Sequence, residues 1–342
     1  MSRAVRTVRT VLGDLDPADL GVTDAHDHLF IRSPLLPGQE LDDPAAAEDV
    51  LRAFAAAGGR TLVQWTPIGL GRGADSLAAL SRSTGVRIVA ATGAHQAVHY
   101  PPSCFPASVP GSASAPGPAS VPGAASAPDP EPGATEVAEA PRPYGDLAER
   151  FVAELTTGLP GAPEGTRAGL IKVAADPGPE SRHTRWTMAA AAEAHHATGA
   201  PIAVHLEADG NPLAVVDRLC HRHGVPPDRV ILGHLTRLPD RALHRSLAGE
   251  GVYLALDSPS RAGHPGDHQA FEVIADLVEA GHAAQLLLGA DTTTRTARAA
   301  GGPARLLTRL APRLARSHGP ELPALLLTAN PAAALAADWR TP

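Results

Sequence analysis

Two histidines, His26 and His28, stand two residues apart where an apolar run of the sequence gives way to loop-like residues. Side chains alternate along an extended strand, so both imidazoles are expected to point the same way. Further polar residues stand in or directly after later apolar runs: Lys172, His205, His234 and Asp291. Imidazole and carboxylate groups suit zinc and similar divalent cations. Four histidines, one aspartate and one lysine make six polar groups, more than one tetrahedral ion needs, so the pattern predicts a site for two metal ions.

Lys172 is the unusual member of this set. A buried lysine is costly unless it is paired or chemically altered, and a plain ammonium would repel a metal ion. A carbamate formed with carbon dioxide would instead be an anionic oxygen ligand able to bridge two cations. The alternative, in which Lys172 pairs with a carboxylate inside the fold, stays open.

A single histidine is more often a hydrogen-bonded core or surface residue than a ligand. Histidines on helical stretches fit that ordinary interpretation: His195, His196, His221 and His223. The joint placement of six candidates at the ends of apolar runs is what favours a metal site.

The elements that must position these residues alternate along the chain. Eight short apolar runs are predicted strands: 21–25, 61–66, 86–92, 169–174, 201–205, 229–234, 252–257 and 285–291. Helical stretches lie between them, among them 45–57, 75–83, 144–157, 185–198 and 211–223. Strands alternating with helices predict parallel βα units, and eight units predict a closed (β/α)₈ barrel, an α/β fold. The competing open sheet is disfavoured because no Gly-x-Gly-x-x-Gly turn follows the first strand.

The barrel explains the placement of the polar residues, because barrel enzymes carry their chemistry at the C-terminal ends of the strands.

One segment is not expected to belong to the folded barrel: residues 103–141 consist largely of Ala, Pro, Ser and Gly and repeat the pattern Ser-Val-Pro-Gly. Such a tract cannot bury enough apolar surface to offset its ordering entropy. We therefore expect a single barrel over residues 1–342, with a disordered insertion after the third strand; a lid or docking segment is the alternative role.

Composition narrows the class of protein. Of 342 residues, 44% are hydrophobic but only 3% aromatic, so Leu, Val and Ala must fill the core. The net charge of -7 gives no basic footprint for nucleic acid. Neither a secretory leader nor an apolar membrane span is evident, and two cysteines, Cys104 and Cys220, make no disulfide framework. These features predict a soluble cytoplasmic protein with no membrane or nucleic-acid partner.

Longer blocks of sequence resemble the phosphotriesterase family of the amidohydrolase superfamily. The resemblance rests on His26-Asp27-His28, Gly69-Leu-Gly-Arg72, Ala91-Thr-Gly93, Arg167-Ala-Gly-Leu-Ile-Lys172, Thr198-Gly-Ala-Pro-Ile-Ala-Val-His205, the block 223–234, Leu288-Gly-Ala-Asp291 and Asn330-Pro331. It covers nearly the whole chain apart from the insertion.

The resemblance implies a binuclear centre, usually of zinc. His26, His28 and Asp291 would hold the more buried ion, and His205 and His234 the more exposed one. A carboxylated Lys172 and a hydroxide would bridge the two ions, and Asp291 would act as general base when the hydroxide attacks. Family resemblance also suggests a homodimer.

Departures from the family pattern bear on the substrate. The aspartate–histidine proton relay of organophosphate-hydrolysing relatives corresponds here to Arg237 and Ser258. Lactonase relatives carry a tyrosine where this chain has His95, and an arginine directly after the seventh-strand aspartate, where this chain has Asp257-Ser258 and then Arg261. The eighth loop holds Arg295 and Arg298, which are candidate clamps for a polar or anionic substrate or, equally, solvated residues on the rim.

These observations together predict a metal-dependent hydrolase acting on a small-molecule ester, lactone or organophosphate, with carboxylic ester or lactone preferred to phosphotriester. Two alternatives remain open. One is a mononuclear amidohydrolase or deaminase in which Lys172 stays unmodified. The other is a catalytically decayed barrel that serves as a binding protein, with the Pro-rich insertion as its contact segment.

Overall fold

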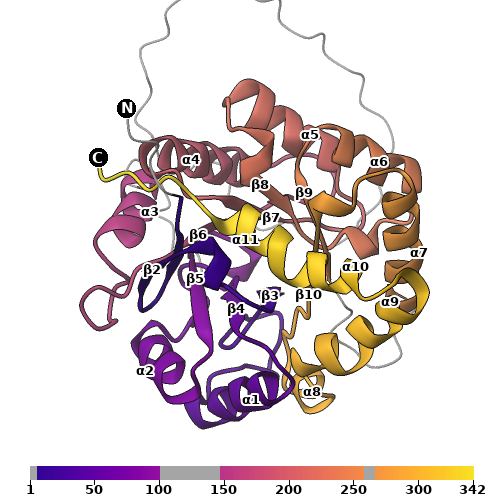
Figure 1. The fold of residues 1–342 in the computed structure, drawn as a ribbon. Coiled ribbons are helices and arrows are strands. Elements are labelled where there is room, and N and C mark those ends of the chain that lie inside the picture. The colour runs from indigo at the N-terminus through magenta and orange to yellow at the C-terminus, as the bar shows by residue number, and fades with distance from the viewer. Residues whose placement is uncertain (1–5, 101–146, 258–265) are drawn as a thin grey trace, which may run out of the picture.

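Eight parallel strands form one sheet in the computed structural model, which describes residues 6–100, 147–257 and 266–342 (Figure 1). The strands are β3 (Thr23–Asp27), β4 (Thr61–Gln64), β5 (Arg87–Gly93), β6 (Leu170–Ala174), β7 (Ile202–His205), β8 (Val230–Leu232), β9 (Tyr253–Asp257) and β10 (Leu286–Gly289). Each strand pairs with the next one along the chain, and every pair is parallel. A backbone hydrogen bond from Asp291 N to His26 O, 2.9 Å long, brings the last strand back to the first. The predicted (β/α)₈ barrel and all eight predicted strands are confirmed.

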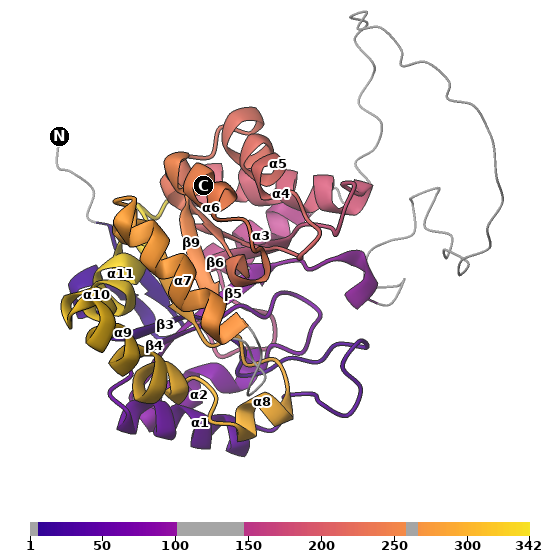
Figure 2. The ribbon, with the colours of Figure 1, turned by 90° about the vertical axis from the view of Figure 1, so that its right-hand side faces the viewer.

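Helices surround the strands, with α1 and α2 on one side and α4 to α6 on the opposite side (Figure 2). Their bounds are α1 (Pro44–Ala56), α2 (Ala74–Thr84), α3 (Leu147–Thr156), α4 (Arg182–Thr198), α5 (Pro212–Val216), α6 (Arg241–Gly249), α7 (Gly266–Glu279) and α8 (Arg295–Ala299). Capping side chains fix where two of these helices begin. At α1 the Asp43 side chain accepts a hydrogen bond from Ala45 N, with Pro44 at the first helical position, and at α4 the Ser181 side chain accepts one from Thr184 N. The predicted helix over 211–223 is present as α5 continued by a wider π turn over Asp217–Arg222.

The core has two layers, and small aliphatic side chains fill both. Inside the barrel, Val63, Ala91, Leu170 and Ala203 pack around Trp65, which is fully buried. A larger cluster of Leu, Val and Ala lies between the strands and the helices. As expected from the scarcity of aromatic residues, Leu, Val and Ala fill most of the core.

Two parts of the fold lie outside the pattern of strands predicted from the sequence. An antiparallel hairpin, β1 (Val8–Thr10) and β2 (Gly13–Leu15), precedes the barrel. After α8 come α9 (Ala311–His318), α10 (Glu321–Ala324) and α11 (Asn330–Leu335). The predicted insertion over 103–141, which includes Cys104, lies outside the described residues. No described helix is both long and apolar enough to cross a membrane.

Candidate metal centre

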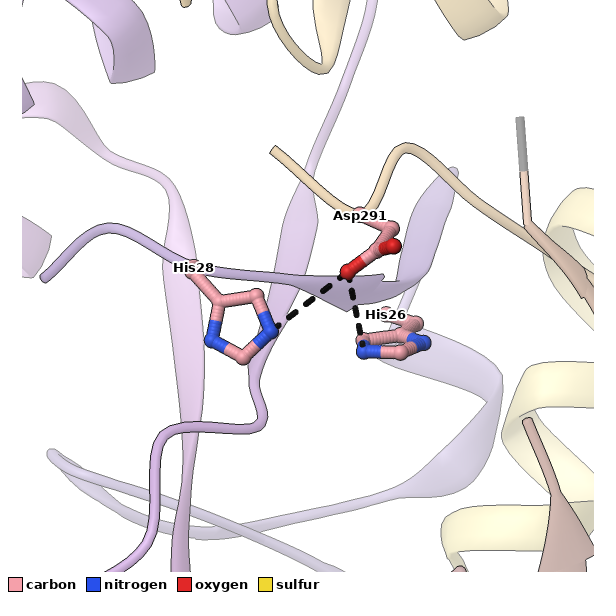
Figure 3. A group of neighbouring side chains, drawn as sticks. All are labelled: His26, His28 and Asp291. Atoms are coloured by element: carbon pink, nitrogen blue, oxygen red, sulfur yellow. Dashed lines mark ion pairs between the residues drawn. The ribbon is translucent and has the colours of Figure 1, made fainter. Parts of the chain in front are cut away.

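The first three candidate ligands converge at the point where β10 returns to β3. His26 Nε2 and His28 Nε2 each lie 3.6 Å from the same oxygen, Asp291 Oδ1 (Figure 3). All three side chains are buried, with 1%, 6% and 4% of their residue surface exposed. We call His26, His28 and Asp291 the inner half of the cluster.

The spacing in the inner half fits a cation. Two ligand atoms bound about 2.1 Å from a tetrahedral zinc ion lie about 3.4 Å apart, close to the observed separations. Asp291 Oδ1 is buried and accepts no hydrogen bond in the described structure, although a buried carboxylate oxygen is costly when left unsatisfied. A bound cation would satisfy this oxygen.

The protonation of His28 follows from its neighbours. Thr66 donates its only hydroxyl hydrogen to the carbonyl of Phe30, so Thr66 Oγ1 must accept from His28 Nδ1, 2.7 Å away. The free electron pair of His28 is therefore on Nε2, the nitrogen that faces Asp291. Burial lowers the pKa of His28 to about 4, an effect only partly offset by Asp291, and the ring is neutral at pH 7.

His205 and His234 form the outer half of the cluster. His205 Nδ1 and His234 Nε2 face each other at 2.8 Å and share one hydrogen bond. His205 Nε2 is 2.8 Å from Glu207 Oε1, and the His205 side chain is 13% exposed. Burial lowers the pKa of His205 to about 4, so this ring also offers a neutral nitrogen.

Asp257, at the end of β9, joins the two halves from behind. Its Oδ1 lies 3.0 Å from His26 Nδ1, and its Oδ2 lies 3.0 Å from His234 Nδ1 and accepts from His234 N at 2.7 Å. A carboxylate behind a metal-binding imidazole fixes the ring and raises its basicity. His26 also stacks on Trp65, with 3.6 Å between ring centroids. No sequence pattern indicated that Asp257, Trp65, Thr66 or Glu207 belongs to the site.

Backbone conformation singles out two of the six candidates. His234 (φ 63°) and Asp291 (φ 48°) are the only residues other than glycine with positive φ in the described chain. Histidine and aspartate enter this region more readily than most residues, but the conformation remains uncommon. Such conformations concentrate at functional sites, where the surrounding structure holds them in place.

Two opposing effects set the pKa of the Asp291 carboxyl group. Burial by itself raises the pKa of Asp291, but His234, His28 and His26 outweigh this effect and lower the pKa below its ordinary range. Asp291 is thus an anion at neutral pH, in the form that binds a cation.

Lys172, in β6, is 1% exposed, and its amine has no hydrogen-bond or ion-pair partner among the residues that the structure describes. Burial lowers its pKa to about 7, so much of the amine is uncharged at neutral pH. It is also the only lysine in the chain, against 28 arginines. Arginine cannot lose its proton or react as an amine, whereas a buried lysine can. The carboxylate pairing left open for Lys172 is not found within residues 6–100, 147–257 and 266–342.

Two glycines let the strands approach closely at the site. A Cβ on Gly93 would lie 2.0 Å from the backbone oxygen of Lys172, and a Cβ on Gly289 would lie 2.6 Å from His26 Cβ. Both values are below any normal contact, so only glycine fits between these strands.

Other residues considered from the sequence have different surroundings. His95 lies beside the outer half, with its ring 4.5 Å from that of His205, and accepts from Gln96 N through Nδ1. Arg298 donates to the carbonyls of His28 and Leu29, which assigns it to loop support rather than to a substrate clamp. Arg295 pairs with Asp42 on the rim and is 61% exposed. Ser258 and Arg261 lie outside the described residues.

Comparison with known proteins identifies the family of this chain. The model of the phosphotriesterase family matches residues 6–113 and 134–332. The chain belongs to the phosphotriesterase family. The resemblance inferred from the sequence is thereby confirmed.

Relatives within this family carry several names. The chain is 29% identical over 291 residues to the phosphotriesterase homology protein of Mycobacterium tuberculosis, covering 83% of this chain and 80% of that protein. It is 28% identical to the phospho-furanose lactonase of Mycoplasmopsis synoviae, covering 83% and 75%. A solved triple mutant of the organophosphorus hydrolase from Deinococcus radiodurans superposes with a TM-score of 0.78 at 25% identity, covering 96% and 97%. The family is one of metal-dependent hydrolases of ester-like bonds, and the buried His and Asp groups of this chain suit that class.

Proposed function

We propose that this protein hydrolyses carboxylic esters or lactones with two divalent metal ions, zinc in the simplest case, held by His26, His28, Lys172, His205, His234 and Asp291. One observation carries the proposal. Each of the four histidines has one ring nitrogen beside a protein partner, and the other faces a further candidate ligand. This arrangement is typical of imidazoles prepared to bind metal.

The roles of the residues follow from their positions. The inner half would hold one ion and the outer half the other, with Lys172 between them. Bound divalent cations supply Lewis acidity toward the scissile bond and lower the pKa of water. Asp291, whose neighbours keep it an anion at neutral pH, would accept the proton of the attacking water.

Lys172 fits this scheme as a carbamate. The electron pair of its amine attacks carbon dioxide, a C–N bond forms, and one N–H proton leaves to solvent. The product carries a negative charge on two oxygens where the ammonium would carry a positive charge. Its lack of a partner among the described residues and its being the only lysine of the sequence support this modification.

Carboxylic esters and lactones are preferred to phosphotriesters because the proton relay of the organophosphate hydrolases is not matched here. Arg237 stands where the relay aspartate would be and cannot accept a proton. A lactonase among the relatives supports the same preference.

The test combines metal content with a signal from Lys172. Protein expressed with ¹³C-bicarbonate should contain about two divalent ions per chain by elemental mass spectrometry and give a ¹³C carbamate resonance from Lys172, the only lysine side chain. Lys172→Arg keeps the positive charge and should lose both the resonance and one ion or more. Lactone hydrolysis should fall with the metal content.

Other outcomes separate the alternatives. One ion per chain, unchanged in Lys172→Arg and without a carbamate resonance, would favour a mononuclear amidohydrolase or deaminase. A fully loaded protein without turnover on a panel of esters, lactones and organophosphates would favour a binding protein.

A further inference from the structure

Arg237 lies beside the candidate metal centre. It ends the short turn Leu235–Arg237 that begins directly after His234. Its Nη2 is 3.5 Å from Asp291 Oδ2, and its Nη1 is 3.5 Å from Glu207 Oε2. The side chain is 40% exposed, so the guanidinium spans from the end of β7 to the end of β10 and still faces solvent.

Both contacts of Arg237 are weak for an arginine. Charge-assisted hydrogen bonds are normally about 2.7–2.9 Å long, and a committed arginine binds a carboxylate through two of them. Arg72 shows that arrangement with Glu154, at 2.6 and 2.9 Å and deeply buried. Arg237 has two long single contacts and no other partner in the described part of the chain. Most of its five N–H donors therefore remain available.

An anion bound by Arg237 would lie close to the groups proposed to take part in hydrolysis. Glu207 is already bound through Oε1 to His205, and Asp291 is the proposed proton acceptor. A group bound by Arg237 would thus lie within a few ångströms of the bond to be hydrolysed. The guanidinium fork matches the paired oxygens of a carboxylate or phosphate.

We propose that Arg237 binds an anionic group of the substrate, a carboxylate or a phosphate, and that the preferred substrates are therefore anionic esters or lactones. This inference rests on the proposed function and narrows it. It assigns to Arg237 the role that the sequence suggested for Arg295 and Arg298. It also explains why a cation stands at the position of the relay aspartate.

The test uses three γ-butyrolactones that differ only in one ring substituent: a carboxylate, a phosphorylated hydroxymethyl group, or a neutral hydroxymethyl group. The wild type should show a higher kcat/KM for at least one anionic lactone than for the neutral one. Arg237→Gln should lower this ratio about 10- to 100-fold, mainly through KM, because a charge-assisted bond is lost. Comparing the two anionic arms shows which anion is preferred.

Controls separate binding from support of the site. Arg295→Gln removes an exposed arginine outside the cluster and should leave the ratio within about 2-fold of the wild type. Arg237→Gln should keep the metal content of the wild type. A ratio unchanged in Arg237→Gln, or a loss of metal that accounts for the whole effect, would overturn the role of Arg237.

Failure of the proposed function would look different. If the metal-loaded wild type hydrolysed none of the lactones, calorimetry with the unreactive γ-lactam carboxylate and its phosphorylated hydroxymethyl counterpart would still test anion binding. Binding of either lactam by the wild type and not by Arg237→Gln would retain the anion site without the hydrolase. No binding of either would overturn both.

Discussion

The inner and outer halves of the cluster contain similar candidate ligands but differ in whether these ligands are hydrogen-bonded to one another. In the inner half, His26 and His28 approach Asp291 Oδ1 at 3.6 Å without a hydrogen bond to it. In the outer half, His205 and His234 are bonded to each other at 2.8 Å. A cation can enter the inner half with little rearrangement, whereas the outer half must first break a hydrogen bond. His205 is the most exposed of the four histidines, whereas His234 is as buried as the inner pair.

The largest effect is expected from Asp291→Asn, which disables the inner half and removes the proposed proton acceptor. Loss of a general base alone costs about 10³-fold in rate. We expect kcat to fall by at least that factor and the metal content to drop, as measured by steady-state kinetics and elemental mass spectrometry. An Asp291→Asn variant with kcat within 10-fold of the wild type would remove Asp291 from the mechanism.

Asp257→Asn should weaken both halves at once, because Asp257 contacts one histidine of each. Loss of a carboxylate behind a metal ligand costs about 10- to 100-fold in metal affinity. Glu207→Gln is the matched variant, since His205 is the one candidate ligand that Glu207 contacts, and the change should affect only the outer ion. Metal titrations of both variants test this contrast; equal effects on both ions in Glu207→Gln would contradict the division into halves.

A smaller effect should separate the two ions of the wild type. Breaking the His205–His234 hydrogen bond should cost the outer ion about 10-fold in affinity relative to the inner ion. Chelator titration should therefore release metal in two steps of one ion per chain. His205→Asn should remove the weaker step alone. A single cooperative release of both ions would show that the halves do not bind independently.

The sequence was sufficient to predict the barrel and the assembly of the six candidates. Parallel strands are buried on both faces and so stand out as apolar runs, and polar residues in or after such runs gather at one end of a barrel. Lys172 and Asp291 are 119 residues apart, yet the strand order predicted that both lie at one end of the barrel, and Asp291 does act on the pKa of Lys172.

The supporting contacts could not be predicted in the same way. Asp257 stands in the sequence like any strand-ending carboxylate, and only the fold shows that it lies between His26 and His234. Trp65 follows an apolar run and gives no sign that its ring stacks on His26. The contacts of Arg298 with the carbonyls of His28 and Leu29 could not be predicted, because these partners lie about 270 residues away in sequence. The hairpin of β1 and β2 has strands of three residues, too short for a periodic pattern.

The lone lysine has one further consequence, for how this protein can be handled and monitored. An endoprotease specific for lysine has a single cleavage site, after Lys172, and this site lies in the buried strand β6. Cleavage would yield fragments 1–172 and 173–342 only after the barrel has opened. The rate of this one cut therefore measures the opening of the barrel, and stabilisation by bound metal would slow it. The residue proposed to bridge the metal ions is thus also a natural reporter of unfolding.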